Sequence, residues 1–166
     1  MMERISNFIN EAERIIIMGI GNVLRSDDAA GAKVAELLEK KVNCKDVTVI
    51  NCMETPENFL GKIEEISPTH IVIIDAVEMN AEPGGVGVFG EEEIDDYPPI
   101  STHRIPLSIM ATYIKKTVGA KLMIIGIQPK RIEFGEEISP EVKETIKLLA
   151  EMLAVMLKGS KCCRKP

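Results

Sequence analysis

The stretch "RIIIMGIGNVLRSDDAAG", residues 14–31, decides how the chain is expected to fold. An apolar run that stops at glycine predicts a short buried strand over 14–19. From Asp27 or Asp28 onward the apolar side chains have helical spacing, so a helix is expected after the loop, with an aspartate as a favourable N-cap. A strand, a glycine-containing loop and a helix in this order begin a β–α–β unit, which predicts a parallel sheet.

The rest of the chain repeats this alternation. Further strands are expected at 46–52, 69–76, 84–90 and 120–129, and helices at 3–13, 55–67, 106–119 and 139–159. Strands that alternate with helices imply right-handed crossovers and a sheet covered on both faces. The sequence therefore predicts an α/β fold: a three-layer α/β/α sandwich, similar to the phosphorylase/hydrolase-like folds, around a mostly parallel twisted sheet of about five strands. The glycine-flanked strand at 84–90 is expected at a sheet edge.

Composition limits the classes of function. The chain has 166 residues, 45% of them hydrophobic, and a formal net charge of −6. We expect a single domain over 1–166, with an N-terminal helical extension at 1–13 and a basic, cysteine-containing tail at 160–166. The acidic balance argues against nucleic acid as a partner. No apolar run is long enough to cross a membrane and no signal peptide is evident, so a cytoplasmic protein without a membrane partner is expected.

The cysteines do not form a metal-binding pattern. None of the four belongs to a Cys-x-x-Cys pair, and a structural zinc site requires four convergent ligands, usually in spaced pairs. We therefore expect free thiols in a reducing compartment. The four residues are Cys44, Cys52, Cys162 and Cys163.

Three potential metal ligands fall at the carboxyl ends of the predicted strands. Asp28 follows the first strand, Asp75 ends the third, and His103 lies in the irregular segment before the helix at 106–119. Ligands of open α/β sheets bind at this edge. Two carboxylates and an imidazole suit a divalent transition metal that keeps open positions for water or substrate. His70, at the amino end of its strand, is expected to be structural.

Each of these residues also has a simpler interpretation. Asp28 can be a helix N-cap, Asp75 an Asx-turn residue and His103 a histidine of a surface loop. The argument for a site therefore depends on the three residues sharing one edge of the sheet.

Two other functions are compatible with parts of the pattern. Dinucleotide binding is disfavoured, because Leu24 occupies the third glycine position of G-x-G-x-x-G and the acidic pair would repel pyrophosphate. A receiver-like phosphoacceptor domain stays open, because Asp27, Asp28, Asp75 and Lys130 match its residue types, although the loop before the acidic pair is too long.

Four stretches, in order, resemble the [NiFe]-hydrogenase maturation endopeptidases (peptidase family M52), nearest to the hydrogenase 3, or formate-hydrogenlyase, type. They are "GIGNVLRSDDAAG", "IVIIDAVEM", "STHRIPLS" and "IIGIQP", and the resemblance covers about residues 14–158. One departure is Ala29, where the family usually has glycine after the acidic pair.

The resemblance implies an activity: hydrolysis of one peptide bond that removes a C-terminal extension from the precursor of a hydrogenase large subunit after nickel insertion. It implies that Asp28, Asp75 and His103 are the metal-binding and catalytic positions. The nickel would be supplied by the substrate, and no organic cofactor is implied. The partner would be the large-subunit precursor, and the enzyme is expected to be a monomer.

The chemistry is expected to be metal-assisted or carboxylate-assisted hydrolysis, because no serine or cysteine lies in a recognisable nucleophile arrangement. Asn22 is expected to help position the site. The alternatives to the endopeptidase are the receiver-like phosphoacceptor and a nickel-binding module without catalysis.

Overall fold

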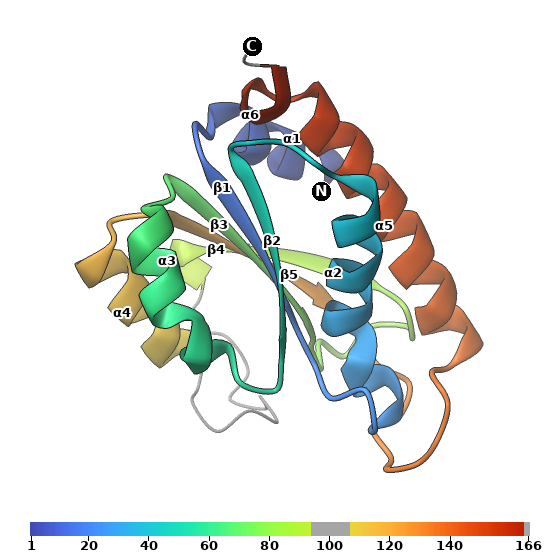
Figure 1. Ribbon diagram of the computed structural model, residues 1–166. Coiled ribbons are helices and arrows are strands. Elements are labelled where there is room, and N and C mark those ends of the chain that lie inside the picture. Colours follow the sequence, from blue (N-terminus) through green and yellow to red (C-terminus); the bar gives the residue numbers. More distant parts are fainter. Residues whose placement is uncertain (94–106, 165–166) are drawn as a thin grey trace.

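The computed structural model describes residues 1–93 and 107–164 of the chain. Five strands form one sheet in the order β2–β1–β3–β5–β4 (Figure 1). All neighbouring pairs are parallel except β4–β5, which is antiparallel and places β4 at an edge. The strands are β1 (Ile15–Ile20), β2 (Val47–Met53), β3 (His70–Ala76), β4 (Val86–Gly90) and β5 (Lys121–Ile127). The predicted strands and the predicted edge position of the fourth are confirmed.

Helices cover both faces of the sheet. Figure 1 shows α2 and α5 side by side on one face, with α1 at their upper end, and α3 and α4 on the other face. The helices are α1 (Met2–Glu11), α2 (Ala30–Lys41), α3 (Leu60–Ile66), α4 (Leu107–Thr117), α5 (Pro140–Gly159) and α6 (Lys161–Arg164); short 3-10 turns are η1 (Ser26–Ala29), η2 (Pro56–Phe59) and η3 (Glu91–Glu93). The arrangement is the predicted three-layer sandwich.

The central strands β1 and β3 are buried on both sides, which explains their continuous apolar runs. All six residues of β1 and all seven of β3 are buried. Alternate side chains enter two separate cores: Ile15 and Ile17 pack towards α2 and α5, whereas Ile16 and Met18 pack towards α3 and α4. Strands between two helical layers have no solvent face and therefore show no polar alternation.

The strand order fixes where loops meet. After β1 the chain crosses to β2 on one side, and after β2 it crosses back to β3 on the other side of β1. The direction of winding thus reverses between β1 and β3. In open α/β sheets the crevice at such a switch point, outside the carboxyl ends of the strands, is where ligands bind. The loop after β1 and the end of β3 meet there.

The prediction of four free thiols is wrong for one pair. Cys44, in the loop between α2 and β2, forms a disulfide with Cys163 of α6, and their Cα atoms lie 5.0 Å apart. Cys52 and Cys162 are buried, and the Cys162 thiol donates to the Ala12 carbonyl at 3.3 Å. The pair is 119 residues apart in sequence. It meets because α5 packs along α2 and brings the C-terminal tail to the loop that ends α2, a contact that cysteine spacing does not reveal.

No helix in the described part of the chain is long and apolar enough to cross a membrane.

Candidate functional site

Glycines in the loop after β1 allow backbone to pack on backbone. A Cβ on Gly31, in the first turn of α2, would lie 2.0 Å from the Ile74 carbonyl oxygen and 2.3 Å from that of Ile20. A Cβ on Gly21 would lie 2.1 Å from the Asp28 carbonyl oxygen. Such distances are far below van der Waals contact, so only glycine fits. The glycines therefore seat the start of α2 on the ends of β1 and β3.

Asp28 lies in the turn that this packing creates. It belongs to η1, is 2% exposed, and accepts a hydrogen bond from the Asn22 N–H at 3.3 Å through Oδ2. The interpretation as a helix N-cap is wrong, because neither η1 nor α2 has a side-chain cap hydrogen bond and α2 begins only at Ala30. The carboxylate instead folds back onto the loop that leaves β1.

Asp75 is the second-last residue of β3 and lies across the switch point from that loop. It pairs with Gly126 of β5 and is 2% exposed. Its Oδ1 accepts the N–H of Ala76 at 2.8 Å, one residue on, rather than the bond two residues on that defines an Asx-turn. Buried carboxylates outside a cleft edge are uncommon and those at strand ends of parallel sheets are often functional, so Asp75 stays a candidate site residue.

Asp27 has a different task from its neighbour, which sequence reasoning did not foresee. It is fully buried, and its carboxylate accepts hydrogen bonds from the backbone N–H groups of Lys130, Arg131 and Ser139 and from the Ser139 hydroxyl. Burial opposes ionisation, but these donors outweigh it and lower the pKa of Asp27. Only the acidic pair itself could have indicated this in the sequence. The side chains of two adjacent residues in one turn point in different directions, so both aspartates are not expected to have the same partners.

The same network changes the role of Ser139. It occupies the N-cap position of α5 with Pro140 after it, as predicted, but its side chain makes no capping hydrogen bond. The Ser139 hydroxyl instead donates a hydrogen bond to the Asp27 carboxylate.

Asn22 connects the loop to a third strand end. Its Nδ2 donates to Oε1 of Glu54, just after β2, at 2.8 Å, and its Oδ1 accepts the Leu24 N–H at 2.8 Å. The loops after β1 and β2 are therefore joined by a side chain as well as by the backbone bond from Gly21 N–H to the Met53 carbonyl. Asn22 therefore organises the loop beside Asp28, and its role in positioning the site stays a prediction.

His103, the third predicted ligand, lies outside the described residues. Within residues 1–93 and 107–164 no group of three or more His, Cys, Asp or Glu side chains could hold a metal ion. Of the three predicted metal ligands, the described part of the chain therefore contains the two carboxylates, Asp28 and Asp75.

His70, predicted to be structural, is buried at the amino end of β3, where its ring contacts the Phe8 ring edge to face. It lies at the opposite end of the strand from Asp75.

A thiol nucleophile at this edge is disfavoured. Cys52 is near the end of β2, but burial raises its pKa to about 12, helped by Glu57 and opposed by Lys62. The nucleophilic form of cysteine is the thiolate, which such a group does not populate at neutral pH. The receiver-like alternative is also weakened, because the Lys130 ammonium pairs with Glu141 on α5 at 2.6 Å.

Exposed apolar side chains surround the carboxyl edge. Leu24 is 59% exposed and Phe134 76% exposed, and their loops are linked by the hydrogen bond from the Gly135 N–H to the Leu24 carbonyl at 2.9 Å. Val23 and Met53, on the loops after β1 and β2, are about two-fifths exposed. Apolar residues clustered around a functional edge are typical of a surface that contacts another protein.

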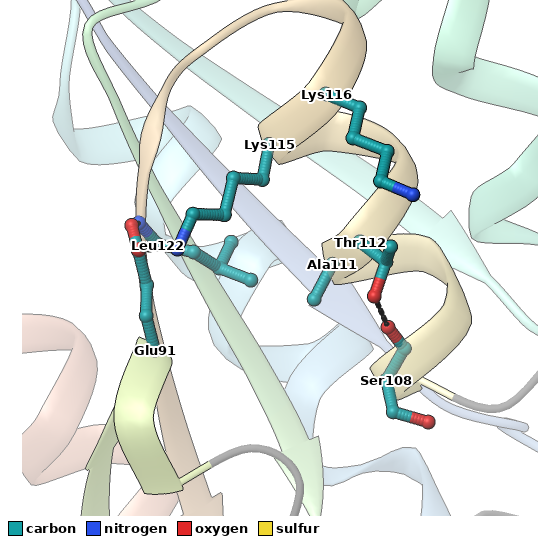
Figure 2. A pocket seen from close by; sticks show the side chains of 7 residues that line it. All are labelled: Glu91, Ser108, Ala111, Thr112, Lys115, Lys116 and Leu122. Atoms are coloured by element: carbon teal, nitrogen blue, oxygen red, sulfur yellow. Dashed lines mark hydrogen bonds and ion pairs between the residues drawn. The ribbon is translucent and has the colours of Figure 1, made fainter.

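A cavity of about 180 Å³ lies away from this edge, between α4 and η3. Figure 2 shows Lys115 reaching across it towards Glu91, with which it pairs at 3.0 Å. Leu122 on its wall is the second residue of β5, at the far end of that strand from Asp75's partner Gly126. This cavity is separate from the candidate site.

Residues 32–155 match the family model described as hydrogenase maturation protease (HycI). A Methanocaldococcus jannaschii protein named, provisionally, as a hydrogenase maturation protease is 42% identical over 150 residues, which cover 86% of this chain and 88% of that protein. The hydrogenase 3 maturation protease of Escherichia coli is 28% identical over 138 residues, covering 83% and 87% of the two chains.

Solved structures agree. The [NiFe] hydrogenase maturation protease HycI of Thermococcus kodakarensis superposes with a TM-score of 0.86 at 38% identity, covering 93% of this chain and 99% of that one. The hydrogenase-maturating endopeptidase HybD of E. coli superposes with a TM-score of 0.74 at 26% identity, covering 89% and 94%.

Proposed function

The chain belongs to the hydrogenase maturation protease family, and on this premise we propose that it cuts the C-terminal extension from the precursor of a [NiFe]-hydrogenase large subunit after nickel insertion. It recognises the inserted nickel through Asp28, Asp75 and His103. The nickel is part of the substrate, so the protease carries no metal or organic cofactor of its own.

One observation carries the proposal: two nearly inaccessible carboxylates, Asp28 and Asp75, flank the switch point of the sheet. They come from segments that are 47 positions apart in sequence (75 minus 28) and that the glycine packing of α2 brings to one edge. Carboxylate oxygens are suitable ligands for a divalent transition metal and suitable proton acceptors. Neither carboxylate is explained by capping a helix.

The chemistry follows from these groups. When the precursor docks, its nickel comes to the carboxylates and the imidazole, which fixes the scissile peptide relative to them. Asp28 or Asp75 takes a proton from the attacking water as general base, and the amine of the released extension takes up a proton as the bond breaks. No covalent enzyme intermediate is required, which agrees with the high pKa of the Cys52 thiol.

The partner is a folded protein rather than a small molecule. The exposed apolar residues on the loops at this edge (Val23, Leu24, Met53 and Phe134) support contact with such a partner, since they offer it apolar surface beside the candidate site. We propose that the protease acts as a monomer in the cytoplasm, as the sequence predicts.

The test is cleavage of nickel-loaded precursor by purified protein and by the variants Asp28→Ala, Asp75→Ala and His103→Ala. Because a general base or a metal-positioning group contributes about a hundredfold or more, we expect each variant to lose at least that much in rate. Asp46→Ala is the matched control. Asp46 precedes β2 at the opposite edge of the sheet and pairs loosely with Arg14 at 3.9 Å, so this variant is expected to cleave at the wild-type rate.

Two outcomes contradict the proposal. Normal cleavage by all three variants would refute the assignment of Asp28, Asp75 and His103 as the site residues. Nickel binding by wild-type protein without shortening of the precursor would show a binding module instead of a protease. Precursor without nickel serves as the second control, and we expect it to stay intact.

A further inference from the structure

The segment after β5, residues 128–131, contacts both the loop that follows Asp75 and the turn that carries Asp28. We propose that Gln128 and Asp27, acting through this segment, are positioning residues that set the relative placement of Asp28 and Asp75. The inference rests on the proposed function, to which it adds the residues that hold the site in shape. It also explains the "IIGIQP" stretch, whose glutamine the proposed reaction does not use.

Gln128 fixes the loop that follows Asp75. The residue is 3% exposed, and its Oε1 accepts the N–H groups of Met79 at 2.7 Å and Ala81 at 3.2 Å. Its Nε2 donates to Oε1 of Glu78 at 2.9 Å and to the Pro129 carbonyl at 3.0 Å. A reversed amide would point N–H groups at N–H groups, so the side chain has one orientation. The loop can be held in this way only by a residue that both donates and accepts.

Asp27 fixes the turn that carries Asp28. Its Oδ2 accepts the N–H groups of Lys130 at 2.8 Å and Arg131 at 3.1 Å, and its Oδ1 accepts the Ser139 N–H at 2.7 Å. Its own N–H points to the Arg131 carbonyl at 3.4 Å. Hydrogen bonds to a buried carboxylate are stronger than neutral ones.

The two anchors lie on one short piece of chain. Gln128 follows β5 directly, and Lys130 is two residues further on. β5 also pairs with β3, so the segment continues from the strand beside Asp75 to the turn that carries Asp28. A displacement at one anchor must therefore pass to the other loop. Because small displacements of reacting groups lower rates steeply, this coupling matters for catalysis as well as for stability.

The decisive variant is Gln128→Glu, which keeps the acceptor for Met79 and Ala81 but replaces both donated bonds with repulsion from Glu78 and the Pro129 carbonyl. We expect kcat for the nickel-loaded precursor to fall at least about tenfold, with KM changed much less, since positioning acts on the transition state. The double variant Gln128→Glu/Glu78→Gln restores a donor facing position 128. We expect it to recover at least about threefold in kcat. Asp27→Asn, which turns an amide N–H2 towards backbone donors, is expected to lower kcat in the same way.

Ser160→Ala is the matched control for lost stability. Ser160 is buried and donates through its hydroxyl to the Leu157 carbonyl at 2.6 Å, at the end of α5 remote from Ser139. It loses a buried hydrogen bond without touching segment 128–131. At a temperature well below every melting point, we expect it to keep the wild-type kcat.

A second measurement is independent of cleavage. In Gln128→Glu, amide hydrogen exchange should accelerate at Met79 and Ala81 and also at Lys130 and Arg131. If wild-type protein cleaves and Gln128→Glu keeps its kcat, the positioning role is refuted while the proposed function stands. If wild-type protein does not cleave, the proposed function fails. The coupling between the loop after Asp75 and residues 130–131 is then tested by the hydrogen-exchange rates alone. Faster exchange confined to residues 78–81 would refute it.

Discussion

Replacing Gly31 with alanine tests whether close packing of α2 builds the site. The new Cβ would lie 2.0 Å from the Ile74 carbonyl oxygen and 2.3 Å from that of Ile20. Both neighbours are backbone atoms in central strands, so no side chain can rotate away. To reach even a tight contact of 3.0 Å, the start of α2 must move by about 1 Å, and a misplacement of that size costs on the order of a hundredfold in rate.

The expected stability change has two opposing parts. Overpacking costs about 1–3 kcal/mol, and the rigid backbone contacts favour the upper end. Alanine in a helix recovers about 0.5–1 kcal/mol relative to glycine. We therefore expect Gly31→Ala to lower the free energy of unfolding by about 2 kcal/mol, measured by urea denaturation, and to lower kcat for precursor cleavage about a hundredfold.

Gly61→Ala is the matched control. Gly61 lies in α3, where an added Cβ has no atom within 4 Å. We expect the free energy of unfolding of Gly61→Ala to be unchanged or higher by about 0.5–1 kcal/mol, and its kcat for precursor cleavage to equal that of the wild type. Gly31→Ala with wild-type stability and wild-type kcat would refute the claim that this contact seats α2 and places Asp28.

Two further predictions concern stability. The Cys44–Cys163 disulfide spans 119 residues, a separation for which loop-closure entropy gives about 5 kcal/mol and typical measurements about 2–4 kcal/mol. Adding a reductant should lower the urea midpoint of wild-type protein but not of Cys163→Ser, and an equal response in both would contradict the prediction. Burial lowers the pKa of His70 from its usual 6.5, with Lys121 adding to the decrease and Glu11 opposing it. The unfolded chain therefore binds a proton at higher pH than the folded one, so stability should fall as pH drops below 6.5. This part of the pH dependence should disappear in His70→Leu, and a stability difference between the two proteins that is constant from pH 8 to about pH 5 would contradict it.

Much of the architecture could be predicted because each element carries a local signal. Residues 71–74 of β3 form a continuous apolar run since both faces of the sheet are covered there. The glycine-flanked run at 84–90 contains the antiparallel edge strand β4. The helix boundaries were predicted less well. The chain makes a 3-10 turn over Ser26–Ala29 before α2 begins, because Asp28 folds back to the Asn22 N–H instead of capping the helix.

The site was predicted in part. The sequence placed Asp28 and Asp75 at strand ends, and the position of such ends in a parallel sheet follows from general rules. The sequence did not separate the roles of the two adjacent aspartates. Asp27 binds three backbone N–H groups and a hydroxyl from segments about 100 or more positions away. The partners of a buried carboxylate depend on tertiary contacts, which residue spacing does not encode.

By itself, then, the sequence determined the order and type of the elements, the candidate carboxylates and the resemblance to the maturation endopeptidases, because periodicity and motifs are local properties of the chain. Only the tertiary structure decided that the loop glycines serve backbone packing, that Cys44 meets Cys163, and that Gln128 and Asp27 connect the loop after Asp75 and the turn that carries Asp28 to one segment. These features depend on which distant segments the sheet order and helix packing bring into contact, and contacts of that kind exist only in the folded chain.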